Sequence, residues 1–161
     1  MNLSIFGPFS LRNLKHKPGK VSHQGFTATL LRQGVAVASI DADGLGPDDD
    51  FVLEFRTQGD QDFFIRRSAE LVKDGFLTRW IAECHLEDLE AQEAFIRLLA
   101  DTIRQVRKME PELETRTFFR TLEDPFDSWS VINAPYRRAL ARKLRTQFPR
   151  VLILNEELAG A

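Results

Sequence analysis

The sequence has little of several residue types that mark specific chemistries. A single cysteine, Cys84, is present among 161 residues, so the chain cannot close an intramolecular disulfide. Only three histidines occur, and His16, His23 and His85 are too widely spaced to outline a His/Cys zinc cluster. The glycine-rich phosphate-binding motifs and the G-x-S-x-G nucleophile motif are absent as well. The common nucleotide-binding and hydrolase chemistries therefore have no support in the sequence.

Long hydrophobic runs are also missing. No apolar stretch approaches the roughly 20 residues that a membrane-spanning helix needs. The first residues, MNLSIFGPFSLRNLK, lack the charged, apolar and small-residue regions of a secretory signal. We therefore expect a cytoplasmic protein without a membrane partner.

What the sequence does contain is the material of a folded core. Hydrophobic residues make up 43% of the chain and charged residues 29%, and thirteen phenylalanines stand against one tyrosine and two tryptophans. This composition is typical of a globular protein. We expect one domain over residues 1–161, with β regions at 1–57 and 116–156 that could form separate sheets.

The N-terminal third alternates apolar and polar residues with the period of two that indicates β-strands. Strands are predicted at 9–15, 25–32, 35–40 and 51–56, and together they predict an antiparallel meander with one buried face. Gln33 and Gly34 lie between the second and third strands. A two-residue hairpin loop there would place Leu30 opposite Val37 and Thr29 opposite Ala38.

The middle of the chain changes to a helical period. The first helix carries an apolar stripe that Gly75 interrupts, formed by Ile65, Ala69, Val72, Phe76 and Trp80. A second helix is predicted over 86–109, with Glu early and Arg and Lys late. Its apolar stripe consists of Phe95, Leu98, Leu99, Thr102, Ile103 and Val106.

The last third predicts a β-hairpin followed by a βαβ unit. The hairpin strands are 117–121 and 128–132. Asn133 is suited to cap a helix over 135–148, and 151–155 is apolar on both faces, which is typical of an interior strand. The predicted fold class is α+β, with two central amphipathic helices between the meander and the C-terminal β regions.

Two segments carry a resemblance to a known group of proteins. One is the Phe-Thr-Ala strand with the Gly34 turn and the Asp43-Gly44-x-Gly46 loop. The other is the run from Thr-Phe-Phe-Arg at 117–120 through Ala-Pro-Tyr at 134–136 to Asn-Glu-Glu-Leu at 155–158. The chain resembles a family of small, functionally uncharacterised α+β proteins of bacteria and their phages. The resemblance implies an intracellular α+β protein and brings no catalytic residues with it.

Charge is unevenly distributed along the chain. Residues 1–40 carry +5, residues 41–127 carry −11 and residues 128–161 carry +4. The helix predicted over 135–148 is rich in arginine and lysine. The planar guanidinium group of arginine suits phosphates and carboxylates, so this basic helix predicts a binding protein whose partner is an acidic protein surface or a nucleic acid. The alternative interpretation is a solvated face, or one paired with the acidic middle of the chain, and the sequence pI of 5.9 favours it. The predicted binding residues are Arg137, Arg138, Arg142, Lys143 and Arg145.

A second hypothesis concerns the acidic loop and strand at 41–54. Clustered carboxylates on a glycine-containing loop suit Ca²⁺ or Mg²⁺, and they could serve a divalent-metal-dependent phosphodiesterase or nuclease. Arg56 stands where such enzymes carry a lysine, and the favoured interpretation of the loop is a solvated turn between strands. We therefore predict a non-enzymatic protein without a cofactor, and leave open its oligomeric state, including a homo-oligomer. The metal ligands of the alternative would be Asp41, Asp43, Asp48 and Glu54.

Overall fold

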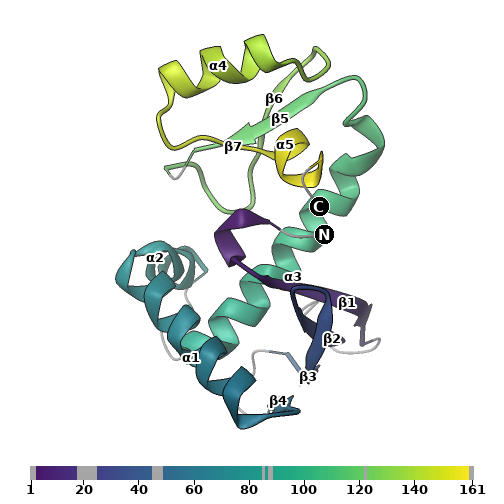
Figure 1. Cartoon of the computed structure of the whole chain (residues 1–161), viewed down its shortest axis with the longest axis vertical. Helices are drawn as coiled ribbons and strands as arrows, with labels where there is room; N and C mark the ends of the chain where they lie inside the picture. The colour runs from purple at the N-terminus through teal and green to yellow at the C-terminus, as the bar shows by residue number, and fades with distance from the viewer. Residues whose placement is uncertain are drawn as a thin grey trace. The chain divides into compact units, whose positions relative to one another are not determined.

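The computed structural model describes residues 3–17, 25–44, 49–84, 86, 89–121 and 123–159. The chain forms two compact units, which we call the N-terminal unit (Ile5–Asp101) and the C-terminal unit (Thr102–Ala161 with Met1–Ser4). Both are built from helices and antiparallel sheet, which confirms the α+β class. Figure 1 labels the elements. None of the helices within the described ranges combines the length and the apolar character that crossing a membrane requires.

The N-terminal unit contains the predicted meander. Its four strands are neighbours in chain order and antiparallel throughout. Alternate residues of β2 and β3 are buried, because one face of the sheet packs on the core and the other meets solvent. The strands are β1 (Phe9–His16), β2 (Phe26–Arg32), β3 (Val35–Ala42) and β4 (Phe51–Phe55).

The turn between β2 and β3 is as predicted, but the register beyond it is not. Gln33 and Gly34 both have positive φ, 51° and 82°, as in the type I′ turns of two-residue hairpins. Leu30 nevertheless lies opposite Ala38 rather than Val37, and Thr29 lies opposite Ser39 rather than Ala38. The predicted register was wrong because Val37 forms a β-bulge, an extra residue on one strand that shifts every later pair by one.

The first predicted helix is divided at Gly75, as expected. α1 (Gln58–Lys73) ends two residues before Gly75. Gly75, with a left-handed φ of 77°, directly precedes α2 (Phe76–Glu83). The buried stripe of α1 differs from the predicted one, because it consists of Phe64, Ser68 and Leu71. Ile65, Ala69 and Val72 lie on the exposed side instead.

Phenylalanine rings form the centre of the N-terminal unit. Phe64 and Phe95 are fully buried with ring centroids 4.9 Å apart, and Phe9 and Phe6 contact the same cluster edge to face. Such pairs add to the stabilisation that burial of the rings already provides. Thr57 caps the N-terminus of α1, because its hydroxyl accepts the backbone N–H of Asp60. This cap satisfies a backbone N–H that the first turn of α1 would otherwise leave without a partner.

The long helix α3 (Ala91–Met109) begins five residues later than the predicted start at 86. All six residues of its predicted apolar stripe are buried, which confirms that part of the prediction. A short 3-10 helix, η2 (Glu110–Glu112), follows with Pro111 inside it. The other 3-10 helix, η1 (Ser4–Phe6), precedes β1.

The C-terminal unit holds the second sheet, with β5 in the middle (Figure 1). The predicted hairpin is present as β5 (Thr117–Arg120) and β6 (Ser130–Ile132). α4 (Arg138–Gln147) connects β6 to β7 (Leu152–Ile153), and β5 pairs antiparallel with both strands. β6 and β7 therefore run in the same direction with β5 between them, and β7 is at the edge of the sheet rather than in its interior.

The strand predicted at 151–155 is shortened by a side chain. α5 (Leu154–Ala159) begins directly after β7. The carboxamide of Asn155 then takes the place of strand backbone: its Oδ1 accepts the N–H of Phe118 at 3.1 Å, and its Nδ2 donates to the carbonyls of Leu113 and Arg116 at 3.0 Å. Because the Asn155 side chain satisfies this backbone N–H at the edge of β5, the chain after Ile153 can form α5 without leaving the N–H unpaired.

α4 begins later than predicted and without the predicted cap. Arg137, not Asn133, occupies the capping position, and its backbone is extended. Pro135 disfavours helical backbone before it, and Tyr136 is held outside the helix by a hydrogen bond to Glu156. The apolar side of α4 faces the core of this unit, since Ala141 and Leu144 pack with Ile153 and the surrounding Tyr136, Leu140 and Phe148.

Candidate functional site: the basic face of α4

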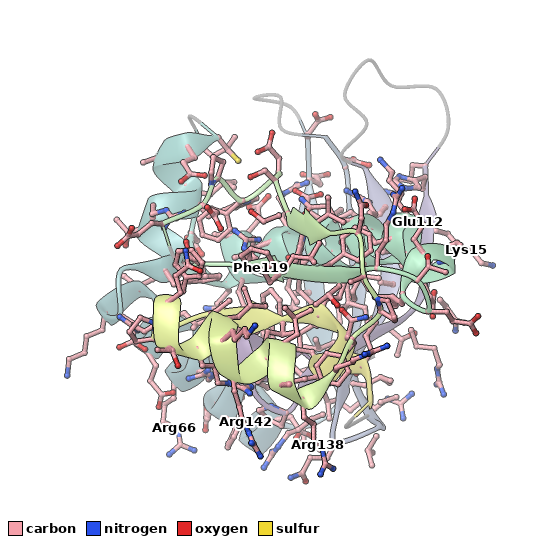
Figure 2. All side chains as sticks on the ribbon, turned by 90° about the horizontal axis from the view of Figure 1, so that it is seen from above. Lys15, Arg66, Glu112, Phe119, Arg138 and Arg142 are labelled. Carbon is pink, nitrogen blue, oxygen red and sulfur yellow. The ribbon has the colours of Figure 1, made fainter. Side chains whose placement is uncertain are left out.

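α4 separates its apolar and basic residues onto different faces. Ala141 and Leu144 are buried against the sheet of the C-terminal unit. Arg138 and Arg142, one turn apart, lie on the exposed side with about 6 Å between their positions. Figure 2 shows both side chains extending away from the helix. Lys143 is also exposed, about 100° further around the helix axis.

Arg145 is the one predicted binding residue that has an acidic partner among the described residues. Its guanidinium donates to both carboxylate oxygens of Glu156 in the first turn of α5, with Nη1 3.1 Å from Oε1. The hydroxyl of Tyr136 donates to the same Oε1 at 2.7 Å. Arg145 lies at the border of the buried face of α4, which turns it towards α5. We call Tyr136, Arg145 and Glu156 the carboxylate cluster.

Protonation of the carboxylate cluster follows from these bonds. The hydrogen bond to Glu156 and burial raise the pKa of Tyr136, and the bonds to Glu156 raise the pKa of Arg145. Burial raises the pKa of Glu156, but the hydrogen bonds from Arg145 and Tyr136 outweigh it, so the pKa of Glu156 is lowered overall. Glu156 is therefore charged at neutral pH and offsets the charge of Arg145.

Four of the predicted cations remain available. Arg137, Arg138, Arg142 and Lys143 are exposed, and none has an acidic side chain within ion-pair distance in the described parts of the chain. We call these four residues the basic face. Elsewhere in the C-terminal unit Arg116 pairs with Glu112. The unit holds eleven basic and eight acidic residues, a net charge of +3.

The acidic loop of the N-terminal unit is arranged around a lysine. Nζ of Lys17 lies 2.8 Å from Oδ1 of Asp43 and also pairs with Asp41, and these hydrogen bonds raise the pKa of Lys17. Glu54 lies on the same exposed face of the sheet, since Asp41 pairs with Val52 two residues before it. Asp48 lies outside the described residues.

The carboxylates of this loop thus already hold a cation from their own chain. Within the described ranges, no three His, Cys, Asp or Glu side chains lie close enough together to hold a metal ion. A divalent ion at Asp41 and Asp43 would have to displace the ammonium of Lys17. The metal-dependent phosphodiesterase hypothesis therefore stays a prediction without added geometric support.

A buried arginine that the sequence did not single out fixes the start of this loop. Arg97 of α3 is 4% exposed, and its Nε donates to Glu93 at 2.7 Å. Its Nη2 donates to the carbonyl of Gly44 at 2.8 Å. The i, i+4 spacing of Glu93 and Arg97 is a signal for the ion pair, but only the structure links it to the loop.

Comparison with protein-family models, with curated proteins and with solved structures gives no match for this chain.

The carboxylate cluster predicts how the stability of the C-terminal unit depends on pH. The pKa of Glu156 is below its ordinary value of 4.5, so its stabilisation is present above pH 4.5 and is lost as the pH falls through the folded value. The pKa of Tyr136 is above 10.0, so its stabilisation is present below pH 10.0 and is lost as the pH rises through the folded value. Glu156→Gln should cost about 1 kcal/mol at neutral pH and reduce the loss of stability in acid.

Urea unfolding at neutral pH and below pH 4.5 measures this difference. Glu112→Gln is the matched control, because the pair of Glu112 with Arg116 is exposed on both sides and should contribute only about 0.3–0.5 kcal/mol. Equal acid dependence in wild type and Glu156→Gln would contradict the assignment.

Proposed function

We propose that this chain is a non-enzymatic binding protein of the cytoplasm that engages a polyanionic partner, a nucleic acid or an acidic protein surface, through the basic face of α4. The observation that carries the proposal is the basic face itself: four exposed cations without an acidic partner among the described residues. An acidic surface would supply the counter-charges that the chain does not.

The composition of the helix supports this proposal. No acidic residue occurs between 128 and 155, so an approaching anion meets no like charge on α4. Three of the four cations are arginines, whose planar guanidinium binds phosphate and carboxylate oxygens in pairs. The interpretation that the chain neutralises its own basic helix accounts for Arg145 but leaves the basic face unexplained.

Salt dependence of binding tests the proposal. A fluorescently labelled oligonucleotide and labelled poly-glutamate are titrated with the protein, and binding is followed by anisotropy. If the four cations of the basic face neutralise four phosphates and release their counterions, the affinity for nucleic acid falls on the order of 100-fold between about 50 and 200 mM salt. Absence of binding to both polyanions at low salt, or binding that does not respond to salt, would contradict the proposal.

A further inference from the structure

A cavity lies at the C-terminal end of α4, within the C-terminal unit. Its volume is about 470 Å³, which falls in the range of about 300–1,000 Å³ typical of ligand pockets. One wall comes from the chain that follows β5 and the other from the end of α4 and the residues after it. The described residues that line it are Thr121, Glu123, Gln147, Phe148, Pro149 and Arg150.

The lining suits a flat ring with polar edges. Phe148 is half-buried, and its ring stacks on Phe119 at 6.0 Å between centroids with 28° between the planes. Phe148 and Pro149 give the cavity an apolar surface, and packing on Phe119 holds the ring in place. Gln147 offers an amide donor and acceptor, and Glu123 offers a carboxylate that can accept the amino group of a base.

Positive charge borders the cavity on the side of the basic face. Lys143 lies one turn before Gln147 on the same side of α4, so the two side chains are neighbours at about 5–6 Å. Arg150 is exposed in the lining itself. Arg142 lies about 7.5 Å before Gln147 along the axis of α4 and about 140° around it, so Lys143 and Arg150 are the cations next to the cavity. A planar ring in the cavity would therefore have cations beside it where attached phosphates lie.

We infer that this cavity takes a base of a single-stranded nucleic acid whose phosphates lie along the basic face of α4. The inference rests on the proposed function and narrows its partner to nucleic acid. Single-strand binding commonly combines a basic track for the backbone with an aromatic side chain on which a base stacks. A base held in a duplex is paired and stacked on both sides, so it cannot enter the cavity.

Oligonucleotides of equal charge distinguish the contribution of the bases to binding from that of the phosphate backbone. The probes are a labelled single strand of about twelve nucleotides, the same strand with abasic sugars throughout, and the corresponding duplex. The single strand with bases should bind roughly 5- to 100-fold more tightly than the abasic strand, because the gain of stacking a base is absent from the latter. The duplex should bind more weakly than the single strand.

Phe148→Leu tests the cavity directly, because leucine retains apolar packing on Phe119 while removing the ring. The variant should bind the intact strand no better than the abasic strand, with abasic binding unchanged. Phe126→Leu is the matched control, since Phe126 is a buried phenylalanine of the same unit that is not among the described residues lining the cavity. If Phe148→Leu does not fold, the comparison of intact, abasic and duplex oligonucleotides on the wild-type protein still tests whether the cavity binds a base.

The outcomes separate this inference from the proposed function. Equal affinity for intact and abasic strands, or for duplex and single strand, would overturn the base site while leaving polyanion binding in place. Poly-glutamate binding as tightly as the intact strand would identify an acidic protein surface as the partner instead. Absence of binding by the wild-type protein to every probe would overturn both the base site and the proposed function.

Discussion

Replacing Arg138 and Arg142 together by glutamate should weaken binding of a polyanion about 100-fold or more at low salt. Each arginine would lose charge-assisted hydrogen bonds worth about 1.5–3 kcal/mol, and each glutamate would add repulsion. The dependence of log affinity on log salt should become shallower by about two, one for each lost phosphate contact. Anisotropy titrations at several salt concentrations measure both quantities. The fold should persist, because both side chains are exposed and make no ion pair with a described residue.

A variant with the same change in net charge shows whether position matters. Arg12→Glu with Lys73→Glu alters two exposed cations of the N-terminal unit, on β1 and in the last turn of α1. We expect this control to bind nearly as wild type, because neither of its cations belongs to the basic face. An equal loss in the control would mean that binding follows net charge alone, and full binding by the α4 variant would remove the basic face from the interaction.

Phe64→Ala should destabilise the N-terminal unit by about 3–5 kcal/mol, the usual cost of emptying a buried phenylalanine site. Phe64 is fully buried, and its ring contacts those of Phe9, Phe55 and Phe95 with centroids 4.9 to 5.5 Å apart. Alanine would leave a cavity that these rings cannot close, because close-packed side chains relax only partly. The midpoint of urea unfolding measures the loss.

The neighbouring residue is the matched control. Ile65 is 38% exposed, so Ile65→Ala should cost less than about 1 kcal/mol. The two variants distinguish the observed face of α1 from the one that the sequence pattern predicts. A larger loss for Ile65→Ala than for Phe64→Ala would mean that the predicted stripe is the buried one.

The error in α1 has an identifiable physical cause. Phe63, Phe64 and Ile65 are consecutive apolar residues, so stripes that begin at Phe64 or Ile65 differ by only about 100° around the helix. The buried stripe contains Ser68, which counts against it in a hydrophobic pattern, but the Ser68 hydroxyl is satisfied by donating to the carbonyl of Phe64 at 3.0 Å. Only the aromatic cluster, formed by distant parts of the chain, decides between the two phases.

The strands and α3 were predictable because their patterns are local and unambiguous. Alternation gives the four strands of the meander, and six buried positions of α3 follow one helical stripe. The bulge at Val37 was not predictable, since nothing in the alternation marks an extra residue on β3.

The candidate site shows the same limit. Exposed cations on α4 follow from helical spacing, but the partner of Arg145 lies 11 residues away on another helix. The loop carboxylates were recognisable as a cluster, yet their pairing with Lys17, across a separation of 26 residues to Asp43, requires the completed sheet. Neighbours along the chain can be inferred from spacing; which distant charge neutralises a given residue depends on the fold.

The central position of β5 delays completion of the C-terminal sheet as the ribosome produces the chain. All strand neighbours in the meander are consecutive, so that sheet can assemble as soon as β4 has emerged. β5 must wait for β7, because Arg120 pairs with Leu152 and Phe119 with Ile153. During that interval one edge of β5 has no strand partner and can pair with another nascent chain. Slow translation between residues 121 and 151 would lengthen this exposure, whereas the same delay before residue 101 would leave β5 unaffected.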